Sequence, residues 1–238
     1  MVGARGRPAN RALGSLSQTD YAAIAPHLSA IDLVRGRILY DVDATIDQVY
    51  FPCDGLVSFV AVTEEGASVE VAAIGKEGVV GGLDTLGDGR SRTRCIVQIP
   101  GSALRIAADD FLAVHERNGA IRHMSALYGQ GLLSQTLRSV ACMAFHSVEQ
   151  RFCRWLLTAR DQVGRDSLEL TQEFLAEMLG CQRTTVTVIA GSLQSAGLIR
   201  YQRGRIEIVD LAGLEEGSCD CYRQTKQIFA RLFPAEGR

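Results

Sequence analysis

The sequence predicts an α+β chain in which an antiparallel β-roll is followed by one long helix and a C-terminal winged helix-turn-helix. Three observations carry this prediction: short β-type runs between about Leu33 and Ile106, a helical period from Ala107 onward, and two short helices joined by a glycine-containing turn at Gly180. A chain of 238 residues is long enough for two modest domains, each with its own core. We expect a flexible tail over 1–15, the roll over 16–118, the long helix over 119–146 and the winged helix-turn-helix over 147–238.

The charge of the chain is nearly balanced, with a formal net charge of −2 and a pI near 6.1. This balance argues against wholesale binding to nucleic acid or acidic membranes, so a polyanionic partner must meet a local basic patch. The apolar runs are far shorter than the ~18 residues of a membrane helix, and no signal peptide is evident. We therefore expect a cytoplasmic protein with no membrane partner, and the seven irregularly spaced cysteines suit reduced thiols.

The predicted roll consists of short apolar runs separated by turn signals such as Glu64-Glu65-Gly66 and Pro100-Gly101. This spacing is typical of a small antiparallel barrel or roll. The runs are Arg37 to Tyr40, Gln48 to Phe51, Leu56 to Val62, Val69 to Ile74, Cys95 to Ile99 and Ala103 to Ile106.

The long helix is predicted by apolar residues that step by three or four from Ile121 to Val140. These positions cover more than one stripe of the helix. One side can therefore pack on the roll and another on a second copy of the chain, as in a two-stranded helical dimer. An ordinary amphipathic helix in a monomer is the alternative at this stage.

The helix-turn-helix is predicted from the stretch that starts at Leu170. Thr171 is the expected N-cap of the first helix, and Gly180 ends it. The second helix, over about 182–196, turns Val186, Ile189 and Leu193 inward. Two short helices joined by so tight a turn form a helix-turn-helix.

The outward face of the second helix carries residue types that read DNA. Arginine binds the guanine edge in bidentate fashion, and threonine hydrogen-bonds bases or touches a thymine methyl group. A β-hairpin with Gly204 at its turn follows as a basic wing, and the window between Met178 and Ile206 holds four arginines and no acidic residue. The predicted DNA-contacting residues are Arg183, Thr184, Thr187, Val188, Gln182, Thr171, Gln172, Arg200, Arg203 and Arg205.

The strings LTQEFLAEMLGCQRTTV and LIRYQRGRIEIV, together with the order of roll, long helix and winged helix-turn-helix, resemble the Crp/Fnr family of bacterial transcription factors. The resemblance implies a sequence-specific transcriptional regulator that binds double-stranded DNA as a homodimer through its long helix. It also implies contact with RNA polymerase and, often, an effector bound in the roll. Thr184 stands where the family commonly has glutamate and Val188 where it has arginine, so the preferred DNA sequence should differ.

The run GKEGVVGGLDTLGDGRSRTR occupies the place where cyclic-AMP-binding members of the family carry Gly-Glu-Leu and a later arginine. Gly82 stands at the position of the ribose-binding glutamate, and Ser91 or Arg92 at that of the phosphate-binding arginine. We expect an effector other than cyclic AMP, if one exists, and whether Arg92 points into the roll is the open question. The candidate pocket residues are Gly81, Gly82, Leu83, Ser91, Arg92, Thr93 and Thr136.

Two alternatives remain, and we expect no cofactor. A cupin-like metal enzyme with an accessory helical domain needs histidines in its barrel, but no histidine lies between Leu33 and Ile106. The four histidines lack paired metal-ligand spacing, and Cys219 and Cys221 have no evident partners, so we predict neither catalysis nor a metal site. A ligand-independent DNA-binding scaffold of the same fold is the second alternative.

Overall fold

The computed structural model describes residues 8–234 of the chain. Residues 1–7 of the predicted tail lie outside the described residues, but the prediction of a tail was wrong for residues 8–15. These residues include helix α1 (Arg11–Gly14), in which Ala12 and Leu13 are fully buried. Asn10 fixes this segment, because its side-chain amide donates to the carbonyls of Pro52 and Gly78 at 2.9 Å each.

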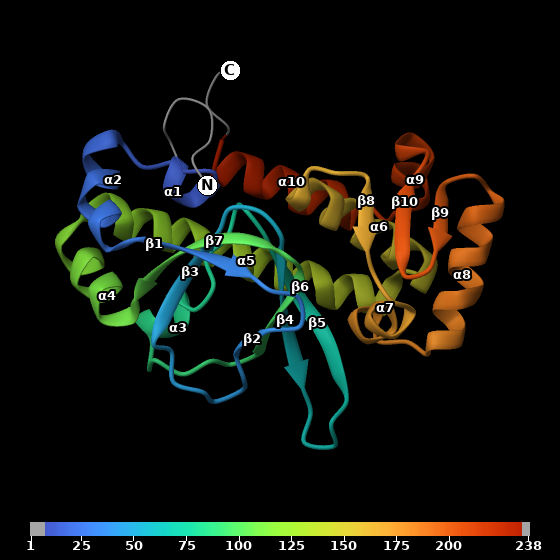
Figure 1. Cartoon of the computed structure of the whole chain (residues 1–238), viewed down its shortest axis with the longest axis horizontal. Coiled ribbons are helices and arrows are strands. Elements are labelled where there is room, and N and C mark those ends of the chain that lie inside the picture. Colours follow the sequence, from blue (N-terminus) through green and yellow to red (C-terminus); the bar gives the residue numbers. More distant parts are fainter. Residues whose placement is uncertain (1–7, 235–238) are drawn as a thin grey trace.

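The N-terminal half forms the predicted antiparallel roll (Figure 1). One sheet has the order β1-β7-β3 and the other the order β2-β6-β4-β5, and every pairing between neighbours is antiparallel. The strands are β1 (Ser29–Leu33), β2 (Ile38–Tyr40), β3 (Gln48–Pro52), β4 (Leu56–Val62), β5 (Ser68–Ile74), β6 (Arg94–Ile99) and β7 (Gly101–Ala107). Strand β1 is an addition to the six predicted runs.

Side chains fill the interior of the roll. Tyr40, Phe59 and Val97 belong to one buried cluster there, and the hydroxyl of Tyr40 donates to the carbonyl of Gln48. Short helices accompany the sheets, and the last of them, α4, leads into the long helix. They are α2 (Gln18–Ile24), η2 (Ala25–His27), α3 (Gly82–Leu86) and α4 (Ala108–Arg117).

The long helix α5 (Gly119–Phe145) agrees with the predicted range to within one residue. It begins at Asn118, whose side chain accepts from the backbone amides of Ala120 and Ile121. Its first half packs on the roll through buried Ile121, Met124 and Tyr128.

The C-terminal unit is a winged helix-turn-helix built around buried Trp155 and its neighbours. Its elements are α6 (Val148–Val163), β8 (Ser167–Glu169), α7 (Gln172–Leu179), α8 (Arg183–Ser195), β9 (Ile199–Gln202), β10 (Arg205–Ile208) and α9 (Leu211–Gly217). The three strands pair in the order β8-β10-β9. The same hydrophobic cluster includes Leu56 and Ile99 of the roll, so the two units share an apolar boundary.

The last helix, α10 (Cys221–Leu232), belongs to both units. Tyr222 at its start packs in the core of the C-terminal unit, whereas Phe229 and Phe233 pack with the roll and α5. A Cβ atom at Gly131 of α5 would lie 2.9 Å from the Phe229 ring, so this glycine permits the close approach of the two helices. Within residues 8–234, no helix combines the length and apolar character needed to cross a membrane.

Candidate nucleic-acid interface

The turn between α7 and α8 has the geometry predicted from the sequence. The Thr171 hydroxyl accepts from the backbone amide of Phe174 at 3.2 Å and so caps α7. Gly180 ends α7 in the left-handed region, with φ of 58°. Gln182 precedes α8 without a side-chain capping bond, as expected for a weak N-cap. Helix α8 therefore projects from a tight, glycine-dependent turn.

The outward face of α8 is exposed. Val186, Ile189 and Leu193 are buried on the inner face, as predicted. On the outer face the Arg183 side chain is 64% exposed and Val188 is 72% exposed. Thr184 and Thr187 are also exposed. The first two turns of α8 thus present both polar and apolar atoms to an approaching ligand.

Arg183 is held by the first turn of α7. Its Nη1 atom lies 2.9 Å from Glu173 Oε1, and its Nε atom donates to Gln172 Oε1 at 3.4 Å. The Thr187 hydroxyl donates to the same Gln172 oxygen at 3.0 Å. The segment from Met178 to Ile206 contains no acidic residue, but an acidic side chain still lies next to it in the structure. Glu173 precedes the segment in the chain and forms an ion pair with Arg183.

The wing is a two-residue hairpin. Arg203 and Gly204 both have positive φ, 49° and 75°, and Gln202 pairs with Arg205 across the turn. This is the pattern of a type I′ turn, which suits a non-glycine residue poorly. Arg203 is exposed at the tip.

The recognition helix and the wing border one open concave surface. Thr171, Gln172 and Arg183 line it from the helices, and Tyr201 and Arg203 line it from the wing. The other two wing arginines are turned to neighbours within the unit. Arg200 Nη1 lies 2.5 Å from Glu207 Oε2, and Arg205 Nε donates to Ser167 Oγ at 2.5 Å.

The residues of the candidate effector pocket lie in different environments. Gly82 is buried, and a Cβ there would lie 2.8 Å from Val79 Cγ1. The buried Ser91 hydroxyl donates to the carbonyl of Thr93 at 2.7 Å. Arg92 instead points to solvent, where its side chain is 65% exposed and pairs with Asp88.

The remaining pocket candidates lie on helices or beside them. Gly81 precedes α3 with φ of 80°, and Leu83 of α3 packs against the cluster that α5 forms with the roll. The Thr136 hydroxyl on α5 donates to its own helix at the Leu132 carbonyl, 3.0 Å away. The structure therefore does not direct Arg92 and Thr136 toward a common ligand.

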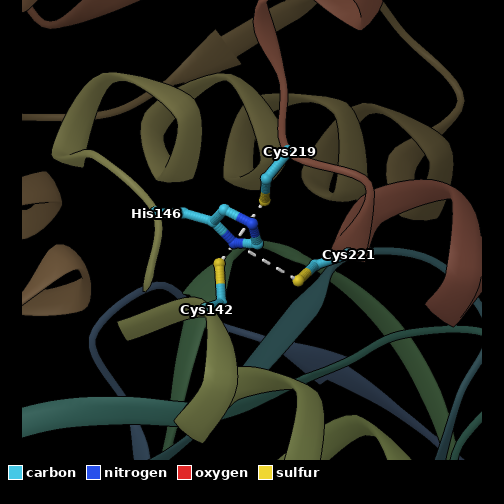
Figure 2. A group of neighbouring side chains, drawn as sticks. All are labelled: Cys142, His146, Cys219 and Cys221. Atoms are coloured by element: carbon cyan, nitrogen blue, oxygen red, sulfur yellow. Dashed lines mark hydrogen bonds between the residues drawn. The ribbon is translucent and has the colours of Figure 1, made fainter. Parts of the chain in front are cut away.

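Cys219 and Cys221, for which the sequence showed no evident partners, come together with Cys142 and His146 at the far end of α5. The ligand atoms of Cys142, His146, Cys219 and Cys221 all lie within 4.8 Å of one another, and Figure 2 shows the side chains facing a common centre. The Cys142 and Cys219 sulfurs are 3.4 Å apart. Their hydrogen bond raises the pKa of Cys142 and lowers that of Cys219 to about 6, as expected when the Cys142 thiol is the donor. The available signal was the short spacing of Cys142 and His146, which lie in the last turn of α5 and just after its end.

Polar contacts join the roll to the C-terminal unit. Trp155 Nε1 donates to Glu70 Oε1 at 2.9 Å, and Gln162 Nε2 donates to Glu77 Oε1 at 2.6 Å. Desolvation raises the pKa of both carboxyls above the ordinary value. The orientation of the C-terminal unit thus depends in part on buried acidic groups of the roll.

Comparisons with known proteins agree with this architecture. Residues 150–216 match the family model described as a Crp-like helix-turn-helix domain, and residues 31–118 match the cyclic nucleotide-binding domain. The chain is 27% identical over 176 residues to the transcriptional regulator SdrP of Thermus thermophilus, an alignment that covers 71% of this chain and 83% of that protein. Among the relatives there is also a global nitrogen regulator of Synechocystis, 23% identical over 76% of this chain and 85% of its own.

Solved structures share the fold. FixK2 of Bradyrhizobium japonicum superposes with a TM-score of 0.67 at 16% identity, over 81% of this chain and 98% of that one. The c-di-GMP-responsive global regulator CLP of Xanthomonas campestris gives a TM-score of 0.67 at 14% identity, over 82% of this chain and 100% of that one.

Proposed function

We propose that this chain, which belongs to the Crp/Fnr family of transcription factors, binds a specific DNA sequence. Helix α8 and the β9–β10 wing contact the DNA in this proposal, and the binding species is a homodimer. The observation that carries the proposal is the exposed outer face of α8, bordered by the wing on one concave surface. A helix of this kind fits the major groove with its N-terminal residues at the base edges.

The residue types assign separate roles to the helix and the wing. Arg183 is the candidate guanine reader, Thr184 a hydrogen-bonding partner of a base, and Val188 a contact for a thymine methyl group. Thr171 and Gln172 line the same surface, and Gln182 is exposed just before the first turn of α8. Arg200, Arg203 and Arg205 are suited to phosphate, which positions the protein without reading sequence.

Glu173 and Gln172 give Arg183 a defined direction before DNA arrives. The ion pair with Glu173 is exposed on both sides, and such pairs contribute about 0 to 1 kcal/mol. Arg183 can therefore exchange the carboxylate for a guanine edge at small cost. Glu173 acts in this proposal as a positioning residue.

Selection from a pool of random DNA duplexes tests the proposal directly. We expect enrichment of a roughly palindromic site whose half-sites are about 34 to 36 Å apart, one helical turn, because two recognition helices related by a two-fold axis enter successive major grooves. If no sequence were enriched and every duplex bound with equal affinity, sequence-specific recognition would be contradicted.

The homodimer is proposed from an apolar stripe on the second half of α5. Leu133, Leu137 and Val140 are exposed at helical spacing, and Phe145 at the end of the helix is 84% exposed. A contiguous apolar stripe on one helix is typical of an interface, and a two-fold dimer pairs the same stripe from each copy.

Leu137→Glu tests the dimer. Two carboxylates would face each other across the two-fold axis, so we expect monomers by analytical ultracentrifugation and loss of tight binding to the palindromic site. Val34→Glu is the matched control, since Val34 is also exposed, at 60%, but lies in the roll away from α5. A dimer that persists in Leu137→Glu would place the interface elsewhere.

The control of DNA binding has two candidate forms. An effector other than cyclic AMP is the first. The second is a ligand-independent scaffold, which the filled roll and the Arg92–Asp88 pair favour. DNA affinity measured with cyclic AMP, cyclic di-GMP and under reducing and oxidising conditions separates them, because a scaffold responds to none. RNA polymerase is the expected protein partner in both forms.

A further inference from the structure

We propose that Cys142, His146, Cys219 and Cys221 bind one divalent transition-metal ion of the zinc type, and that this ion clamps the end of the long helix to the start of α10. The site lies apart from the roll and from the DNA-contacting face. Its consequence for DNA binding rests on the function proposed above.

The spacing of the four ligand atoms fits a single ion. Cys142 Sγ lies 3.4 Å from Cys219 Sγ, and Cys221 Sγ lies 3.6 Å from His146 Nδ1. Metal distances of about 2.3 Å to sulfur and about 2.0 Å to nitrogen put tetrahedral donors about 3.5 to 3.8 Å apart. An iron-sulfur cluster needs a wider set, because its protein ligands are distributed over two or more irons.

The donor set selects the class of metal. Three thiols and one imidazole make the Cys3His set of structural zinc sites, with no vacant donor position for a substrate. Soft sulfur donors also disfavour Mg²⁺ and Ca²⁺, which take oxygen ligands. The three sulfurs are buried and His146 is partly buried, so water is largely excluded from the site.

The surroundings of the four ligands support a metal site. His146 turns Nδ1 to the thiols, while its Nε2 lies 3.7 Å from Asp220 Oδ1 on the other side of the ring. A carboxylate behind the second ring nitrogen is the usual orienting group of a metal-bound histidine. Three thiolates and a divalent ion leave one negative charge. Arg154, whose Nε atom is buried and has no hydrogen-bond partner among residues 8–234, interacts electrostatically with Cys142 and Cys219.

The position of the site gives it a mechanical role. Only His146 and Ser147 separate α5 from α6, so they form the hinge between the long helix and the DNA-binding unit. Cys142 lies in the last turn of α5, and Cys219 and Cys221 flank Asp220 at the start of α10. A bound ion therefore cross-links both sides of the hinge and favours one orientation of the unit that carries α8.

Titration of the reduced, metal-free full-length chain with Co²⁺ tests the site. We expect one Co²⁺ per chain, the visible absorption of tetrahedral cobalt, near-ultraviolet thiolate-to-cobalt bands, and displacement of Co²⁺ by Zn²⁺. The Cys219→Ala/Cys221→Ala chain should lose these bands, and Asp220→Asn should bind Zn²⁺ about 10- to 100-fold more weakly. Cys95→Ala, which removes a similarly buried thiol from the roll, should bind Co²⁺ like the wild type.

Several results would overturn the site. One is the absence of tetrahedral cobalt bands from the wild-type protein. This measurement does not depend on whether any variant folds. Others are bands that persist in the double variant, a bound iron-sulfur chromophore, or a Cys142–Cys219 disulfide that forms in the presence of excess Zn²⁺.

The selected DNA duplex provides the second readout. Zn²⁺-loaded and metal-free wild type should differ about 5- to 150-fold in affinity, the usual range of coupling between two sites. Equal DNA affinities of the two forms would refute the coupling between the metal and DNA binding. The metal site itself would still stand on the cobalt spectrum. Co²⁺ binding by a chain that selects no DNA sequence would instead refute the proposed function alone.

Discussion

The roll and the winged helix-turn-helix use their polar side chains in opposite ways. In the roll, Ser91 is buried and bonded to the carbonyl of Thr93, and Arg92 is paired with Asp88 at the surface. In the winged unit, Arg183 and Arg203 border an open concave surface. Arg183 also pairs with Glu173, so the two units do not differ in whether their arginines have partners. They differ in arrangement: the winged unit gathers two of its arginines around one open surface, whereas Ser91, Arg92 and Thr136 of the candidate pocket do not face a common ligand.

This difference bears separately on the proposed DNA binding and on the expected effector pocket. DNA binding needs exposed basic groups on a preformed helix, and that arrangement is present. Recognition of a cyclic phosphate needs an arginine directed into the roll, a charge-assisted bond that is hard to replace.

Arg183→Ala should have the largest effect. Loss of a bidentate contact to guanine costs about 1 to 3 kcal/mol and relaxes the preference at one base pair. Affinity for the selected duplex and for the same duplex with that guanine replaced measures both effects. Arg35→Ala is the control, because Arg35 is exposed on a turn of the roll. If Arg183→Ala bound the selected duplex as tightly as wild type, another residue would be the reader.

Arg203→Gly should move two properties in opposite directions. Arginine in the left-handed region is strained by about 1 to 2 kcal/mol, and glycine relieves this strain at an entropic cost of about 0.5 to 1 kcal/mol. The free energy of unfolding should therefore rise by about 0 to 1.5 kcal/mol. DNA binding should weaken for every sequence, and the log-log salt slope should fall by about one unit.

The conservative variant Arg203→Lys separates charge from backbone. It keeps the positive charge and the strained conformation, so the salt slope should remain that of wild type. A normal salt slope in Arg203→Gly would show that the wing tip does not reach the phosphates.

Glu77→Gln should change the pH dependence of stability at the boundary between the two units. Desolvation raises the pKa of Glu77, although nearby Arg11 and Lys76 oppose the shift. Between the ordinary carboxyl pKa and the raised value, the folded chain binds more protons than the unfolded chain. The free energy of unfolding therefore falls as the pH rises through this window. The variant loses this contribution and keeps an oxygen that accepts from Gln162.

Denaturant unfolding of wild type and Glu77→Gln from pH 5 to pH 8 measures the effect. The stability of the variant relative to wild type should increase with pH, because only the wild type must ionise a buried carboxyl. A constant difference would mean that Glu77 keeps the same proton affinity on unfolding.

The fold was predictable because its elements follow local rules. The long helix keeps an apolar period from Ile121 to Val140, and Thr171 and Gly180 are residue types that start and end helices. The segment 8–15 was missed because its order depends on Asn10 bonding to carbonyls of Pro52 and Gly78, which are distant in sequence. Periodicity carries no information about such contacts.

The sites were predictable only where their residues are close in sequence. The recognition helix and wing lie within one short window, so their shared surface could be expected. The four-residue cluster joins Cys142 and His146 to residues more than 70 positions later, and only the packing of α10 along α5 brings them together. The Arg183–Glu173 pair shows the same limit, because charge windows in sequence do not report neighbours in space.

Arg92→Ala should change the free energy of unfolding least of all these variants. It also tests most directly whether the roll binds a phosphate. Its pair with Asp88 is exposed on both sides, so removal should change the free energy of unfolding by less than about 0.5 kcal/mol. Ser91→Ala, the comparison variant, removes a buried bond to the Thr93 carbonyl and should cost about 0.5 to 1.5 kcal/mol. Neither change should alter DNA affinity in the presence of cyclic nucleotides. A nucleotide response that Arg92→Ala abolishes and Ser91→Ala preserves would show that Arg92 turns into the roll when a phosphate is bound, and the contrast between the two units would no longer hold.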